Sequence, residues 1–95
     1  MTYDNGLVQK ALVSLVIETT LLEIGKETYD KVVHDLHKKY HCYLPDCYEH
    51  PEYLSEILKD LYGNAHSVVV EKIDKQLEEF LYHKSISDFL KILNQ

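Results

Sequence analysis

Four side chains of types that bind metal ions lie within ten residues, in the stretch HCYLPDCYEH at positions 41–50. They are His41, Cys42, Cys47 and His50. Imidazole nitrogens and thiolate sulfurs are common ligands of zinc. The stretch is therefore a metal site, a redox pair of cysteines, or only the connection between two helices.

A row of polar side chains leads into this stretch. Asp30, His34, His37 and His41 are spaced i, i+4, i+7 and i+11, so on a helix they share one side. Histidines three or four residues apart bind zinc, nickel or copper. The predicted metal site takes its ligands from His34, His37, His41, Cys47 and His50, with zinc as the cofactor.

The spacing also supports a simpler interpretation, in which no cofactor is expected. It does not match a zinc finger, and the adjacent His41 and Cys42 do not both point comfortably at one ion. The histidines are then a solvated border row, and the cysteines are small residues packed under a turn.

A redox switch through Cys42 and Cys47 is a second hypothesis for the same stretch. Four residues separate the two cysteines, and Pro45 is one of them, so a turn could bring their α-carbons within the roughly 7 Å that a disulfide requires. Few cationic side chains lie near enough to lower the pKa of a thiol. In the cytoplasm, two cysteines are by default free thiols.

Composition places the chain among globular proteins with one domain. It has 95 residues, of which 45% are hydrophobic and 27% charged, so a packed core is expected over residues 1–95. The net charge of -6 repels phosphate backbones and makes nucleic acid an unfavourable partner. No apolar run approaches the ~20 residues of a membrane span, and the start lacks the features of a secretory signal. We expect a cytoplasmic location without membrane association.

The order of apolar residues, glycines and prolines predicts helices throughout. Helical spacing runs through residues 5–24, 26–40, 51–62 and 65–84, and a short last helix follows. Gly25 and Gly63 are expected to end helices, Gly25 in the left-handed conformation, and Pro51 to begin one. The predicted fold is all-α: a single compact bundle of four to five helices with short connections.

The first predicted helix has apolar residues on two sides. One stripe holds Leu7, Val8, Ala11, Leu12, Leu15, Val16 and Leu22, and a second stripe holds Val13, Ile17 and Ile24. A helix that is apolar on two sides must be covered on both, by its own fold or by a second copy of the chain. We predict that Val13, Ile17 and Ile24 form an interaction face. The alternative is their burial under the last helix, around Phe89 and Leu93.

Residues 23–69 resemble the Nitrosopumilus output domain of the fifth type, a small helical module of archaeal signal-transduction proteins. The resembling residues are Gly25, Leu36, Tyr40, Pro51, Leu58 and the segment YGNA at positions 62–65. With the flanking helices, the resemblance covers roughly residues 10–80. It implies an interaction or output role without assigned catalytic residues. The cysteines and most histidines of residues 34–50 do not belong to the family pattern.

The most favoured function is therefore a small helical protein-interaction or output module in archaeal signal transduction, binding another protein or itself as a homodimer. No catalysis is expected, because the chain has no glycine-flanked nucleophile, phosphate loop or metalloprotease motif. The alternative is a metal-responsive or redox-responsive sensor that uses the histidines and cysteines of residues 34–50.

Overall fold

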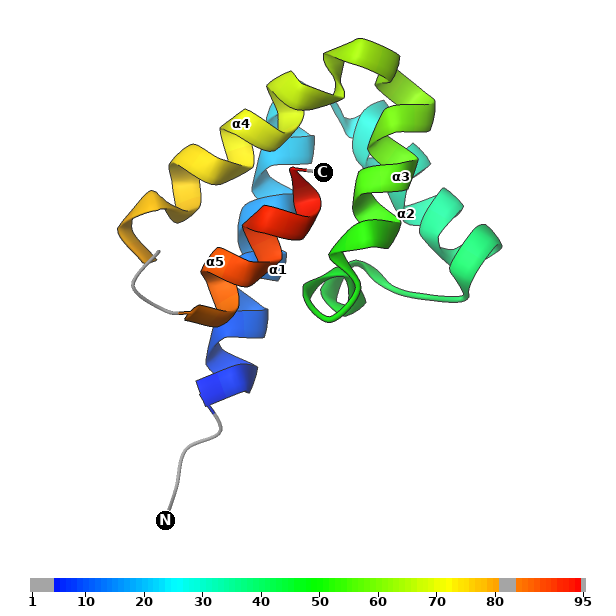
Figure 1. The fold of residues 1–95 in the computed structure, drawn as a ribbon. Coiled ribbons are helices and arrows are strands. Elements are labelled where there is room, and N and C mark those ends of the chain that lie inside the picture. Colours follow the sequence, from blue (N-terminus) through cyan, green and yellow to red (C-terminus); the bar gives the residue numbers. More distant parts are fainter. Residues whose placement is uncertain (1–4, 81–83, 95) are drawn as a thin grey trace.

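The computed structural model describes residues 5–80 and 84–94, which form five α-helices and three short 3-10 helices (Figure 1). The α-helices are α1 (Asn5–Ile24), α2 (Lys26–Tyr40), α3 (Pro51–Tyr62), α4 (His66–Leu77) and α5 (Lys84–Leu93). The 3-10 helices are η1 (Leu44–Tyr48), η2 (Gly63–Ala65) and η3 (Glu78–Phe80). The predicted all-α bundle with short connections is confirmed.

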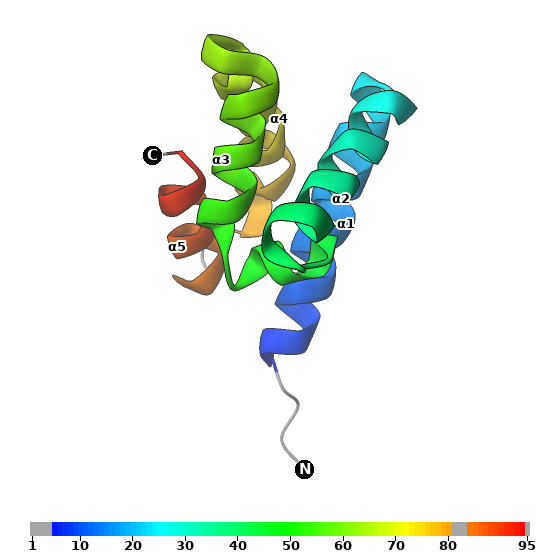
Figure 2. The same ribbon diagram turned by 90° about the vertical axis from the view of Figure 1, so that its right-hand side faces the viewer.

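Helix α1 contacts α2, η1, α4 and α5. It forms an antiparallel hairpin with α2, and α3 runs back beside α2 (Figures 1 and 2). Helix α4 crosses to α1, and α5 packs against α3 and α1. The first turns of α1 extend beyond the other helices in both views. Among the described residues, no helix is long and apolar enough to cross a bilayer.

Two of the three predicted helix boundaries form as expected. Pro51 is the first residue of α3, where its fixed φ suits the helix and its missing N–H costs nothing. Gly63 ends α3 with φ 57°, a conformation that favours glycine. Gly25 differs from the prediction because its φ of 162° is extended, not left-handed. The left-handed residue is instead His41, whose N–H donates to the carbonyl of His37 and closes α2.

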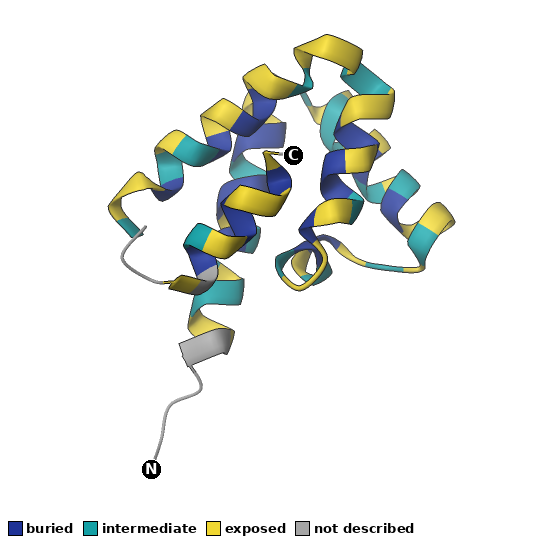
Figure 3. Ribbon diagram, in the orientation of Figure 1, coloured by how far each residue is buried: buried dark blue, intermediate teal, exposed yellow. Residues whose placement is uncertain are grey.

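The core takes apolar side chains from all five helices and from η1, and buried positions face the interior of the bundle (Figure 3). Its fully buried members include Ile17 of α1, Leu36 of α2, Leu58 of α3 and Ile73 of α4. Thr20 is also buried, and its hydroxyl oxygen accepts a hydrogen bond of 2.9 Å from Gln76 Nε2. This bond joins α1 to α4 and satisfies a polar group that would otherwise be costly to bury.

Candidate functional site

The stretch from residue 41 to residue 50 is foremost a connection between α2 and α3. The left-handed His41 turns the chain at the end of α2, and η1 then carries Leu44 and Cys47 into the core. η1 and the residue that follows it are also tied to α1: the Tyr48 hydroxyl donates to Gln9 Oε1 at 3.0 Å, and Lys10 Nζ lies 2.8 Å from Glu49 Oε1. Local turn geometry and core packing therefore fix the positions of the histidines and cysteines.

The structure does not bring together the five residues predicted to bind zinc. His34, His37, His41 and His50 are exposed, whereas Cys47 is 1% exposed in the core. The rings of His37 and His41 have centroids 6.3 Å apart. Throughout residues 5–80 and 84–94, no three His, Cys, Asp or Glu side chains converge in a geometry that could hold a metal ion. The five predicted ligands therefore do not converge on one point, as a zinc site would require.

His50 has a structural environment of its own, away from the other histidines. Its ring stacks on Tyr53 with a centroid distance of 4.6 Å, and Tyr53 stacks on Tyr40 at 4.0 Å. The Tyr40 hydroxyl donates a hydrogen bond to Glu56, and this bond is the main reason that the pKa of Tyr40 is raised to about 12. These contacts join the end of α2 to the start of α3. Sequence reasoning missed the stack, because its members come from two helices whose packing angle no local pattern gives.

The two cysteines are free thiols in different environments. Burial is the main cause that raises the pKa of Cys47 to about 12, so its thiol stays protonated at neutral pH. Cys42 is partly buried, and its Sγ donates to the carbonyl of Tyr40 at 3.3 Å. A protonated, buried thiol is a poor nucleophile. A redox switch that needs Cys47 as a reactive thiolate is therefore disfavoured.

We expect the two thiols to react very unequally with 5,5′-dithiobis(2-nitrobenzoic acid) at pH 8. Cys42 should react first, and Cys47 at least about a hundredfold more slowly, because its reaction requires an opening that costs about 3 kcal/mol or more. The measurement is the time course of absorbance for the parent chain and for Cys42→Ala. Equal rates, or a disulfide between Cys42 and Cys47 after mild peroxide, would contradict the packing of Cys47.

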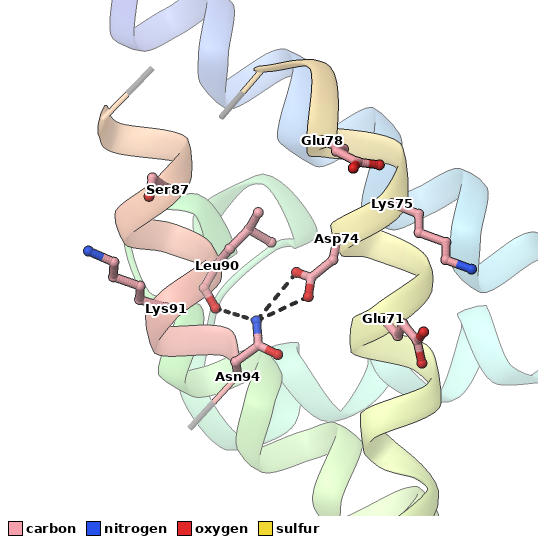
Figure 4. Close-up of a pocket in the computed structure, with 8 residues that line it drawn as sticks. All are labelled: Glu71, Asp74, Lys75, Glu78, Ser87, Leu90, Lys91 and Asn94. Carbon is pink, nitrogen blue, oxygen red and sulfur yellow. Dashed lines mark hydrogen bonds between the residues drawn. The ribbon is translucent and has the colours of Figure 1, made fainter. Parts of the chain in front are cut away.

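A hollow of about 650 Å³ lies between α4 and α5 (Figure 4). Asp74 and Leu90 face it, and Lys75 and Lys91 also line it, with their ammonium ends directed outward. Asn94 Nδ2 donates to the Leu90 carbonyl at 2.7 Å and lies 3.3 Å from both carboxylate oxygens of Asp74. Burial raises the pKa of Asp74, and the bond from Asn94 partly offsets that effect. We interpret these bonds as a polar clamp that fixes the last turn of α5 to α4.

The prediction of an interaction face on Val13, Ile17 and Ile24 is wrong for two of its residues. Val13 and Ile17 are fully buried in the core cluster that also contains Phe89 and Leu93. Of the three predicted residues, only Ile24 at the helix end is exposed. The reason is rotational: α1 turns Val13, Val16, Ile17, Thr20 and Leu21 inward. The alternative of burial within the fold is the one that the structure shows.

The other side of α1 is an exposed apolar arc. Five apolar residues on this side are exposed: Leu7, Val8, Ala11, Leu15 and Leu22. At 100° per residue they fall within an arc of roughly 100°, which also contains Glu18. An apolar arc of this width is typical of a helix face that packs against other structure. We call these six residues the outer face of α1.

A groove of about 460 Å³ runs along one edge of this outer face. Its walls include Leu7, Ala11 and Leu15 of α1 and Pro45 of η1, and Lys10, Ser14 and Glu18 also line it. Lys10 is held by Glu49, the residue that follows η1, so the two walls are joined at that point. The groove gives the outer face a concave side where a protruding apolar side chain would fit.

Comparisons with known proteins give no relative: no family model, no curated protein and no solved structure matches the chain. The resemblance to the archaeal output domain therefore stays a prediction. The structural class is the all-α helical bundle, and the feature that calls for a functional explanation is the outer face of α1.

Proposed function

We propose that this protein is a small helical protein-interaction module that binds its partner through the outer face of α1. A role as an output domain in archaeal signal transduction is proposed from the resemblance described above. Catalysis is not part of the proposal. The supporting observation is the alignment of exposed apolar side chains along the whole of α1.

Apolar side chains of α1 remain in contact with water, although their burial would be stabilising. Leu7 and Val8 are 64% and 65% exposed, and Leu15 and Leu22 are 59% and 45% exposed. Full burial of such a side chain stabilises by about 1.5–3 kcal/mol, so each of the four leaves about 1 kcal/mol unrealised. Scattered exposed apolar residues are ordinary, but a contiguous set on one helix marks a contact surface.

Site-specific photo-crosslinking in cells of the source organism tests this function. A benzophenone amino acid at Leu15 should give a discrete product larger than the monomer, because the partner covers this position. The matched control is the same substitution at Val68, an apolar residue of α4 that is 54% exposed and lies off the outer face. Absence of any product from Leu15, or equal products from both positions, would refute an interaction through α1.

A further inference from the structure

Resting on the proposed function, we propose that the outer face of α1 binds a second copy of the same chain, with the two α1 helices antiparallel. The two-fold axis would pass between positions 14 and 15. Such an interface is isologous: each copy offers the same surface, and the surface must complement itself. Three properties of α1 meet this requirement.

The first property is the placement of bulky and small side chains. Leu7 and Leu22 lie at the two ends of the outer face and are equally far from the proposed axis. An antiparallel pairing therefore brings Leu7 of each copy onto Leu22 of the other. Near the axis, Ala11 and Ser14 are small and let the helix backbones approach, and Leu15 of each copy, which lies next to the axis, faces Leu15 of the other. Bulky and small side chains thus alternate along the interface between the two α1 helices.

The second property is the distribution of charge. Lys10 lies in the first half of α1, whereas Glu18 and Glu23 lie in the second half. This order is opposite to the one that the helix dipole favours, since α1 has no acidic residue in its first turn and no basic residue in its last. An antiparallel copy places Glu18 beside Lys10 and places Glu23 beside the positive end of the other helix. A parallel copy would instead place like charges side by side.

The ammonium group of Lys10 can still donate a hydrogen bond to Glu18 of the second copy. Its Nζ lies 2.8 Å from Glu49 Oε1, and Asp46 Oδ1 is farther away at 3.8 Å. An ammonium group has three donors. The Lys10 side chain is 27% exposed, so it can reach a carboxylate that arrives along the groove. Glu49 would then hold Lys10 in position for Glu18 of the second copy.

The third property is the groove between α1 and Pro45, which receives the ridge of side chains from the second α1. The area also indicates the strength of the pairing. A helix of 20 residues is about 30 Å long, and a helix contact is about 10 Å wide, which gives roughly 300 Å² for the strip. Stable interfaces bury roughly 800 Å² per partner. We therefore expect a reversible equilibrium between monomer and dimer.

Sedimentation equilibrium with untagged, reduced protein measures this directly. The mass should rise from 11.2 kDa towards twice that value as the concentration increases from about 10 µM to about 1 mM. Leu15→Glu should weaken the dimer at least about thirtyfold, since a carboxylate would meet the apolar centre of the pairing. Leu22→Glu should do the same, and Val68→Glu should change nothing. A mass that stays at 11.2 kDa overturns the proposal, as does an equal loss in Val68→Glu.

Disulfide trapping in a Cys42→Ala background tests the antiparallel register. A mixture of Leu7→Cys and Leu22→Cys chains should form a disulfide dimer, and neither chain alone should do so. Dimers formed by each chain alone would indicate a parallel arrangement and overturn the register. If purified protein is monomeric but the photo-crosslink at Leu15 contains a different protein, the second copy is refuted and the interaction function stands. If the purified protein stays monomeric and the photo-crosslink at Leu15 gives no product, both the dimer and the interaction function are refuted.

Discussion

Replacing Ile17 by alanine is expected to lower the free energy of unfolding by about 2–5 kcal/mol, whereas Leu15→Ala should change it by less than about 0.5 kcal/mol. The two residues lie two positions apart on α1 and have similar size. Ile17 is fully buried and Leu15 is 59% exposed. Truncation of Ile17 removes buried methyl groups and leaves a cavity, while truncation of Leu15 removes contacts mainly with water.

Thermal unfolding followed by circular dichroism at low protein concentration measures the difference. For a domain of this size, 1 kcal/mol corresponds to about 4–8 °C in Tm, so Ile17→Ala should melt at least about 8 °C below the parent chain. Leu15→Ala is the matched control, because both changes give alanine in the same helix. Equal losses in the two variants would mean that the inward side of α1 is assigned wrongly.

The second large effect concerns pH. Burial raises the pKa of Cys47 to about 12 from the ordinary value of 9.0, because the core disfavours the thiolate. In the unfolded chain the thiol ionises near pH 9, while the folded chain keeps its proton. The unfolded state therefore binds fewer protons between pH 9 and 12, and stability falls as pH rises through this range. Because the pKa of the thiol rises from 9.0 to about 12, the loss of stability amounts to about 4 kcal/mol once the folded thiol also ionises.

Tyr40 contributes in the same direction. Its pKa is raised to about 12 from 10.0, mainly because its hydroxyl donates to Glu56. Ionisation of this phenol removes the bond and places a negative charge beside a carboxylate. The side chain lies near solvent, so its effect is screened and smaller than that of the buried thiol. Both groups are fully protonated below pH 9, where neither reduces stability.

Urea unfolding at pH 7, 9 and 10.5 under reducing conditions tests the contribution of the thiol. The parent chain should lose stability above pH 9, and Cys47→Ala should lose much less over the same interval, whatever its stability at pH 7. Cys42→Ala should retain the slope of the parent chain. A slope that is unchanged in Cys47→Ala would show that the thiol does not titrate as a core residue.

The residue spacing in the candidate site does not decide by itself what the site does. The interval from His34 to His50 contains good metal ligands, and nothing in the spacing alone separates a metal site from a turn. In the structure, Cys47 points into the core, and His50 stacks on Tyr53. These outcomes depend on the left-handed turn at His41 and on the packing of η1 against α1. The packing of η1 against α1 and the stack of Tyr53 on Tyr40 join residues that are distant in sequence, so a local pattern could not reveal them.

Local sequence patterns predicted the helices, the start of α3 at Pro51 and the two apolar sides of α1, whereas the fourth helix was predicted to reach residue 84 and α4 ends at Leu77. Helical periodicity and the backbone preferences of proline and glycine act within a few residues, so they can be read locally. Which side of α1 faces the core depends instead on contacts between helices. The seven-residue stripe through Leu7 and Leu15 is largely exposed, whereas Val13 and Ile17 of the shorter set are buried. Both sides are apolar, so the rotation of α1 is set by its packing against α2, η1 and α4, of which only α2 follows it directly in the chain.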